Sequence, residues 1–75
     1  MTLEKVFTEV FAIPETSVND VLELKQIAAW DSMNHMVLIS RIEAVFNIQL
    51  TGDEIAEMRT VGDARAALRS RNLLP

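Results

Sequence analysis

The fold of this chain is decided by the stretch from Asp31 to Phe46, DSMNHMVLISRIEAVF, whose apolar residues recur with the period of a helix. The run is too long and too regular for a strand, so it predicts a central helix from Ser32 to Phe46. Asp31 stands where an N-cap residue belongs, because its carboxylate can accept from the free N–H groups of the first turn. The stripe expected to face the core is Leu38, Ile42, Val45 and Phe46. Further apolar surface is predicted at the N-terminal end of the helix, from Met33, Met36 and Val37.

Three further helices are predicted on either side of this one. Leu3 to Phe11 carries an apolar stripe at helical spacing, with Thr2 placed to cap it. A short third helix from Gly52 to Met58 begins with a Thr-x-x-Glu capping box. A fourth helix from Val61 to about Arg71 begins with a similar motif, Thr-x-x-Asp, at Thr60. No segment alternates with the period of a strand. The sequence therefore predicts an all-α fold, a small four-helix bundle with a long first loop and a short third helix.

The long first loop extends from Pro14 to Ala29, where no apolar period persists. Pro14 closes the first helix, and the segment has room for a short helical turn. A loop of this length is unusual in so small a domain and tends to be functional. The residues expected to anchor it to the core are Val18, Leu22, Leu24 and Ile27. At the other end of the chain, residues 73–75 are expected to form a tail.

The composition excludes several classes of protein. The 75 residues allow one domain, expected to span residues 1–75, with a radius of gyration of about 11 Å. Without cysteine and with a single histidine, the chain depends on helix packing rather than on disulfides or a metal. No apolar run is long enough to cross a bilayer and no export signal is evident, which predicts a cytoplasmic protein without a membrane association.

The net charge of −4 resides in the first two-thirds of the chain. Residues 1–50 contain seven acidic and three basic residues, whereas residues 51–75 contain four of each. This distribution favours basic partners and disfavours nucleic acid. The arginines near the C-terminus alternate with acids and are interpreted as a solvated face, comprising Arg59, Arg65, Arg69 and Arg71.

Ser32 and His35 are the candidates for catalysis, since a spacing of three residues brings their side chains to one side of a helix. A serine at a helix start and a histidine one turn later lack the oxyanion donors and the cleft that nucleophilic catalysis requires. A metal site built on Asp31 and His35 also fails, because no further ligand is marked. We therefore expect neither an enzyme nor a metal site.

Ser32 has a second possible role as a place of attachment. An Asp-Ser pair at a helix start is ordinary capping chemistry, and most such pairs do nothing else. Here, however, Ser32 follows a long loop, begins the most apolar helix and is flanked by Met33 and Met36. A phosphate esterified to its hydroxyl would be stabilised by the positive end of the helix dipole.

Several motifs together resemble those of the acyl carrier proteins, whose signature is Asp-Ser-Leu or Asp-Ser-Met at the start of the second of four helices. The matching residues here are Asp31-Ser32-Met33, near the middle of the chain. The likeness extends from Val6 to Leu68. It includes an apolar helix ending in Glu43-Ala44-Val45-Phe46, the exit Asn47-Ile48-Gln49-Leu50, then Glu54, Met58 and Thr60-Val61-Gly62-Asp63.

The resemblance implies a non-catalytic carrier. In that family a phosphopantetheinyl transferase uses coenzyme A and magnesium to esterify the serine, here Ser32, with 4′-phosphopantetheine. The thiol of this arm holds an acyl group as a thioester, so the carrier itself needs no cysteine. Asp31 would cap the helix and help to orient the attachment site.

The resemblance also implies that the second helix recognises partner enzymes. In fatty-acid carriers this helix is strongly acidic, whereas here the first acid after Asp31 is Glu43. Recognition should therefore be more apolar, which indicates a dedicated biosynthetic pathway rather than general fatty-acid synthesis. The residues expected to contact partners are Met33, Met36, Val37 and Glu43, with Trp30 and His35 beside them.

Trp30 and His35 have competing interpretations. Trp30 most simply covers the helix end as packing, and its alternative is a flat surface for the arm or for a partner enzyme. His35 is interpreted as a surface residue of the helix, close enough to Ser32 to touch a partner or the phosphate. A departure from the family pattern is Ala29, which stands where the family often has glycine.

The sequence thus predicts a monomeric carrier of acyl groups. Its expected partners are the phosphopantetheinyl transferase, an acyl- or aminoacyl-loading enzyme, and the enzymes that accept the acyl group. Two alternatives stay open: an aminoacyl carrier of the D-alanyl or peptidyl type, and an unmodified helical interaction module in which Ser32 is only part of a cap.

Overall fold

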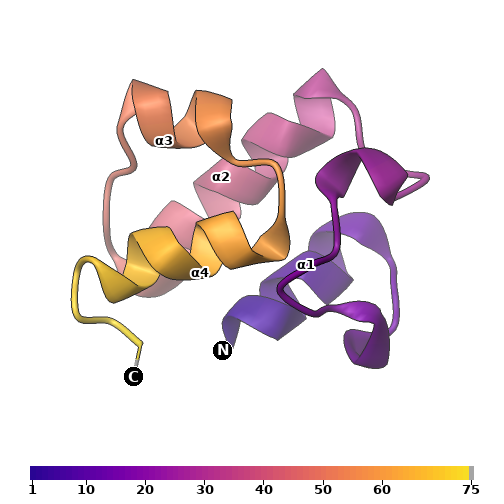
Figure 1. The fold of residues 1–75 in the computed structure, drawn as a ribbon, viewed down its shortest axis with the longest axis horizontal. Helices are drawn as coiled ribbons and strands as arrows, with labels where there is room; N and C mark the ends of the chain where they lie inside the picture. The colour runs from indigo at the N-terminus through magenta and orange to yellow at the C-terminus, as the bar shows by residue number, and fades with distance from the viewer. Residues whose placement is uncertain (75) are drawn as a thin grey trace.

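The protein is a small bundle of α-helices in which one long connection covers a side of the molecule (Figure 1). The computed structural model describes residues 1–74. Within them, the helices are α1 (Leu3–Phe11), α2 (Ser32–Phe46), α3 (Gly52–Glu57) and α4 (Val61–Arg69). The connection between α1 and α2 contains two 3-10 turns, η1 (Glu15–Ser17) and η2 (Leu24–Gln26). The predicted all-α four-helix fold, with its long first loop and short third helix, is confirmed.

The first two helices have the predicted bounds because local capping sets them. Thr2 Oγ1 accepts a hydrogen bond from the Lys5 N–H at 3.2 Å and so begins α1. That helix ends at Phe11, because Ala12 caps it with a left-handed backbone, φ 55°, so Pro14 lies beyond the end and does not cause it. Asn47, with φ of 54°, ends α2 in the same way.

The last two helices are shorter than predicted. The capping boxes of Thr51 and Thr60 are both present, but α3 ends one residue before Met58. The fourth helix ends at Arg69 rather than near Arg71. Beyond Arg69 the chain continues in tighter turns, in which the Arg71 N–H donates to Leu68 O at 3.1 Å and the Asn72 N–H donates to Arg69 O at 2.9 Å.

The long connection is bound to the start of α4 by backbone hydrogen bonds. The Leu24 N–H donates to Arg59 O at 2.8 Å, and the Val61 N–H donates to Leu22 O at 3.1 Å. The Gly62 N–H donates to Asp20 O at 3.0 Å. These bonds join residues 35 to 42 positions apart and hold the connection against the bundle (Figure 1).

The core lies between α1, α2, α4 and the connection. Of the four predicted anchors, Val18, Leu24 and Ile27 are buried and Leu22 is partly buried. Helix α3 contributes no fully buried residue and lies on the outside. The buried residues of the helices are Leu3, Val6, Phe7 and Phe11 from α1, Leu38, Ile39 and Ile42 from α2, and Val61, Ala64 and Leu68 from α4. The predicted residues Val45 and Phe46 are partly buried against this core.

The interpretation of the C-terminal arginines as a solvated face is wrong for two of them. Arg65 donates from Nε to Asp20 at 2.6 Å and from Nη2 to Glu4 at 2.8 Å, and its side chain is only 17% exposed. The hydrogen bond from Arg65 also lowers the pKa of Glu4. Arg71 pairs with Glu54 at 2.6 Å. Such pairings join segments distant in sequence, which a local charge pattern does not reveal.

The predicted tail is partly packed. Leu74 lies against the core as a partly buried side chain, and Leu73 is 39% exposed. Pro75 lies outside the described residues.

Candidate functional site

The N-terminus of α2 is built as the sequence predicts, with Asp31 as its cap. Asp31 has an extended backbone, and its Oδ1 accepts from the Asn34 N–H at 2.7 Å. Its carbonyl accepts from the His35 N–H at 2.8 Å and so begins the helical hydrogen bonds. The carboxylate therefore accepts a hydrogen bond from one of the otherwise free N–H groups of the first turn, and it lies at the positive end of the helix dipole.

Ser32 is the first residue of α2, and its side chain is exposed. Among residues 1–74 its hydroxyl has no hydrogen-bond partner, since the side-chain cap is made by Asp31. The hydroxyl is thus accessible at a fixed position and is not engaged in holding the helix.

Asn34 is a supporting residue that the sequence analysis missed. Its Nδ2 donates to the carbonyl of Ala29 at 2.7 Å, across the start of the helix. The Trp30 N–H in turn donates to Ile27 O at 3.0 Å. Together these bonds fix the backbone on both sides of Asp31 and Ser32. The sequence signal was weak, because asparagine in a first turn is common.

His35 is clamped between Trp30 and α3 and is partly buried, so the expectation of a surface residue is corrected. The Trp30 indole Nε1–H donates to His35 Nδ1 at 3.1 Å, and His35 Nε2 lies 3.0 Å from the Ile55 carbonyl oxygen. Since Nδ1 accepts and a carbonyl can only accept, this network assigns the neutral ring with its proton on Nε2. The two rings meet edge to face, with centroids 6.0 Å apart.

Trp30 is partly buried against the core, which agrees with its interpretation as packing. Its indole also borders the space next to Ser32. The two interpretations of Trp30 are therefore compatible in this geometry, and its contact with an arm or a partner stays a prediction.

A pocket of about 680 Å³ opens beside Ser32. One wall comes from the start of α2 and from the residue before its N-cap, and its residues are Trp30, Ser32, His35 and Met36. The opposite walls come from α3 and the segment after it, and from η2 of the long connection. The residues there are Ile55, Ala56, Met58 and Arg59, then Glu23, Leu24 and Lys25. The sequence predicts residues of the first wall but not of the others, because the other walls join it only in the folded chain.

The apolar surface predicted at the N-terminal end of α2 is present. The exposed fractions are 77% for Met33, 49% for Met36 and 45% for Val37. With Ser40 and Arg41 these three side chains line a shallow hollow on the outer face of α2. Arg41 is partly occupied by an ion pair with Glu9 at 2.9 Å.

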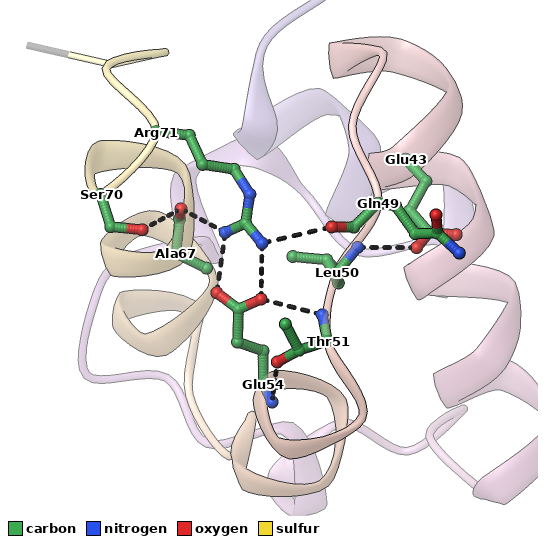
Figure 2. A network of polar contacts seen from close by, with 8 residues as sticks. All are labelled: Glu43, Gln49, Leu50, Thr51, Glu54, Ala67, Ser70 and Arg71. Carbon is green, nitrogen blue, oxygen red and sulfur yellow. Dashed lines mark hydrogen bonds and ion pairs between the residues drawn. The ribbon is translucent and has the colours of Figure 1, made fainter.

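Glu43 is not among the residues that line this hollow. It is eleven residues after Ser32, which corresponds to about 16 Å along the helix. Its Oε2 accepts from the Leu50 N–H at 2.9 Å and so holds the exit of α2 (Figure 2). Glu43 therefore stabilises the chain that follows α2, and its contact with partners stays a prediction.

Residues 1–74 contain no cluster of three or more possible metal ligands. No helix in the described part of the chain is long and apolar enough to span a membrane.

The comparisons with known proteins identify the fold. No family model matches this chain, and no curated protein matches its sequence. Among solved structures, the chain is similar to one described as "a putative acyl carrier protein" from Mycobacterium tuberculosis. The TM-score is 0.81 at 18% sequence identity, covering 93% of this chain and 99% of the other. At this identity the likeness shows the fold, which is that of an acyl carrier protein, and nothing more.

Proposed function

We propose that this chain is a carrier without catalytic activity, which holds acyl groups as thioesters on a 4′-phosphopantetheine arm attached to Ser32. It would deliver them to partner enzymes of a dedicated biosynthetic pathway. The observation that carries the proposal is the Ser32 hydroxyl, which is exposed and unbonded among residues 1–74 at the start of α2 in an acyl-carrier-like fold.

The residues around Ser32 suit a phosphodiester. The free N–H groups and the positive end of the α2 dipole favour an anion at the first turn. Asp31 caps the helix and Asn34 ties it to Ala29, so the hydroxyl is held in place without being used. The arm would supply the thiol that a chain without cysteine lacks.

Arm attachment is the direct test of the proposal. The purified protein is incubated with coenzyme A, magnesium and a broad-range phosphopantetheinyl transferase, and its intact mass is measured. We expect a gain of one phosphopantetheinyl group, lost in Ser32→Ala and kept in Ser40→Ala, which removes another exposed hydroxyl from α2. No gain would instead favour an unmodified helical module, and a gain that survives Ser32→Ala would contradict attachment at Ser32.

The partner surface is proposed to be the exposed apolar part of α2, formed by Met33, Met36 and Val37. Truncating an exposed apolar anchor removes contact area that only a partner can cover. We expect Met36→Ala to lower the transferase kcat/KM by about fivefold or more, and Glu43→Lys to lower it less.

A control is needed because Glu43 also holds the Leu50 N–H. Glu43→Gln keeps an acceptor oxygen and removes the charge, so it separates the two roles. A greater loss from both Glu43 variants than from Met36→Ala would show that recognition is acidic after all.

The carrier role also bears on the location of the protein and on its choice of partners. A carrier that meets enzymes of a biosynthetic pathway is expected in the cytoplasm as a monomer with one carrier domain. Trp30 and His35 flank the attachment point, and we propose that they help to select which enzymes this carrier meets.

A further inference from the structure

Two cations next to Ser32 are left without a partner. Arg41, Arg65 and Arg71 each form an ion pair with a carboxylate. Within residues 1–74, by contrast, the side chains of Lys25 and Arg59 have no ion-pair or hydrogen-bond partner. Both of them line the pocket beside Ser32.

The rest of the pocket wall is mainly apolar. Met36 from α2, Ile55 from α3 and Met58 after it line the pocket, as does Leu24, the buried first residue of η2. Glu23 is the one acid on this wall, so the lining carries one net positive charge on a chain whose net charge is −4. Both ring nitrogens of His35 face uncharged groups, the Trp30 indole and the Ile55 carbonyl. An apolar wall with a cationic rim is complementary to a short carbon chain that ends in an anion.

We infer that the acyl group carried by this chain ends in a carboxylate, which Lys25 and Arg59 bind at the rim of the pocket beside Ser32. This inference rests on the proposed attachment of the arm to Ser32. The arm is flexible enough for its end to return to the surface beside its own attachment point. The carbon chain of the cargo then lies against Met36, Ile55 and Met58, and its carboxylate meets the two cations.

The same charges bear on the aminoacyl alternative. The ammonium group of an aminoacyl cargo would meet the like charges of Lys25 and Arg59, and like charges brought together are unfavourable. The pocket therefore favours an acidic acyl cargo over an aminoacyl cargo.

The test compares two cargoes that have the same number of carbons. A phosphopantetheinyl transferase loads the protein from adipoyl-coenzyme A or from hexanoyl-coenzyme A, and intact mass verifies the loading. Cleavage of each thioester by hydroxylamine is then followed, and its rate is divided by that of the same acyl-coenzyme A. A docked cargo shields its thioester, so the normalised rate reports on docking.

We expect the adipoyl form to be cleaved about twofold to fivefold more slowly than the hexanoyl form, because partly exposed ion pairs stabilise a contact only weakly. The double variant Lys25→Gln with Arg59→Gln should abolish the difference. Lys5→Gln should retain it, because Lys5 is an exposed lysine of α1 that does not line the pocket. Salt at about 1 M should narrow the difference, since it screens exposed charges beyond about 3 Å.

Three results would overturn the inference: equal normalised rates, better protection of the hexanoyl form, or a difference that survives the double variant. An equal change for both cargoes in the double variant would assign the cations to the phosphodiester of the arm instead. A protein that accepts no arm fails at the mass measurement. That failure contradicts the proposed function itself and is distinct from the other results.

Discussion

At the residue scale, Asp31 and Ser32 have separate roles at the start of α2, since Asp31 caps the helix and Ser32 keeps a free hydroxyl among the described residues. The Asp31 carboxylate takes the Asn34 N–H at 2.7 Å, so the Ser32 hydroxyl is not needed for the cap. Capping and attachment are therefore compatible interpretations of this pair, because the cap presents the hydroxyl. His35, one turn later, joins α2 to α3 through the Ile55 carbonyl.

Gly62 is a residue whose size matters for the position of the long connection. A Cβ at this position would come within 2.9 Å of the Asp20 carbonyl oxygen, which accepts the Gly62 N–H. Alanine would therefore push the connection away from α4. This cost opposes the stabilisation that alanine usually gives over glycine within a helix. We expect Gly62→Ala to lower the free energy of unfolding by about 1–3 kcal/mol, measured by urea unfolding.

Gly52 is the matched control for this substitution. It also lies in the first turn of a helix, but a Cβ there meets nothing within 4 Å. Gly52→Ala should leave the free energy of unfolding unchanged or raise it by up to about 1 kcal/mol. Equal effects of the two substitutions would show that the close approach at Asp20 is not a constraint.

At the scale of elements, α3 depends on contacts with its neighbours. The helix has six residues and none of them is fully buried, so it is too short to be stable alone. Arg71 holds it from the C-terminal side, with Nη1 and Nη2 donating to the two carboxylate oxygens of Glu54 at 2.7 and 2.6 Å (Figure 2). The same guanidinium donates to the carbonyls of Ala67 and Gln49. The chain after α4 is thereby fastened to α3 and to the exit of α2.

This contact makes stability depend on pH. The hydrogen bonds from Arg71, and then from the Thr51 N–H, lower the pKa of Glu54 from 4.5 to about 2. A lowered pKa in the folded state means that the stabilisation is present above pH 4.5 and is lost as the pH falls towards 2. We expect Glu54→Gln to lower the urea midpoint at neutral pH and to flatten its decline between these two pH values.

The control for this prediction is Glu57→Gln on the same helix. Glu57 is exposed and has no ion pair among the described residues, so its variant should keep the wild-type decline. An unchanged profile for Glu54→Gln would show that the pair with Arg71 does not stabilise the protein.

The sequence predicts the elements well wherever the cause is local. The apolar period and the Thr2 and Asp31 caps gave α1 and α2 their correct bounds. The end of α4 was missed, because no proline or glycine marks the place where its hydrogen bonds change to the tighter i−3 pattern. The ion pairs of Arg65 with Glu4 and of Arg71 with Glu54 were also missed, since each joins distant parts of the chain. Local patterns carry no information on such partners.

At the scale of the whole molecule, the radius of gyration is 11.1 Å, as expected for a chain of this length. A body this small has no interior room for a deep active site, and its pocket is formed at the surface between three segments. The sequence predicted Ser32, Trp30, His35 and Met36 at this place. It could not place Lys25, Arg59 or α3 beside them, because the packing of the long connection decides that arrangement.

The most direct measurement of the central claim is the intact mass of this protein isolated from its own cells, followed by mass spectrometry of its peptides. We expect a phosphopantetheinyl group on the peptide that contains Ser32, and, on part of the molecules, a thioester-linked group that ends in a carboxylate. An aminoacyl group at the same place would contradict the inferred cargo but not the carrier role. An unmodified Ser32 peptide from cells in which the protein is active would contradict the carrier role itself.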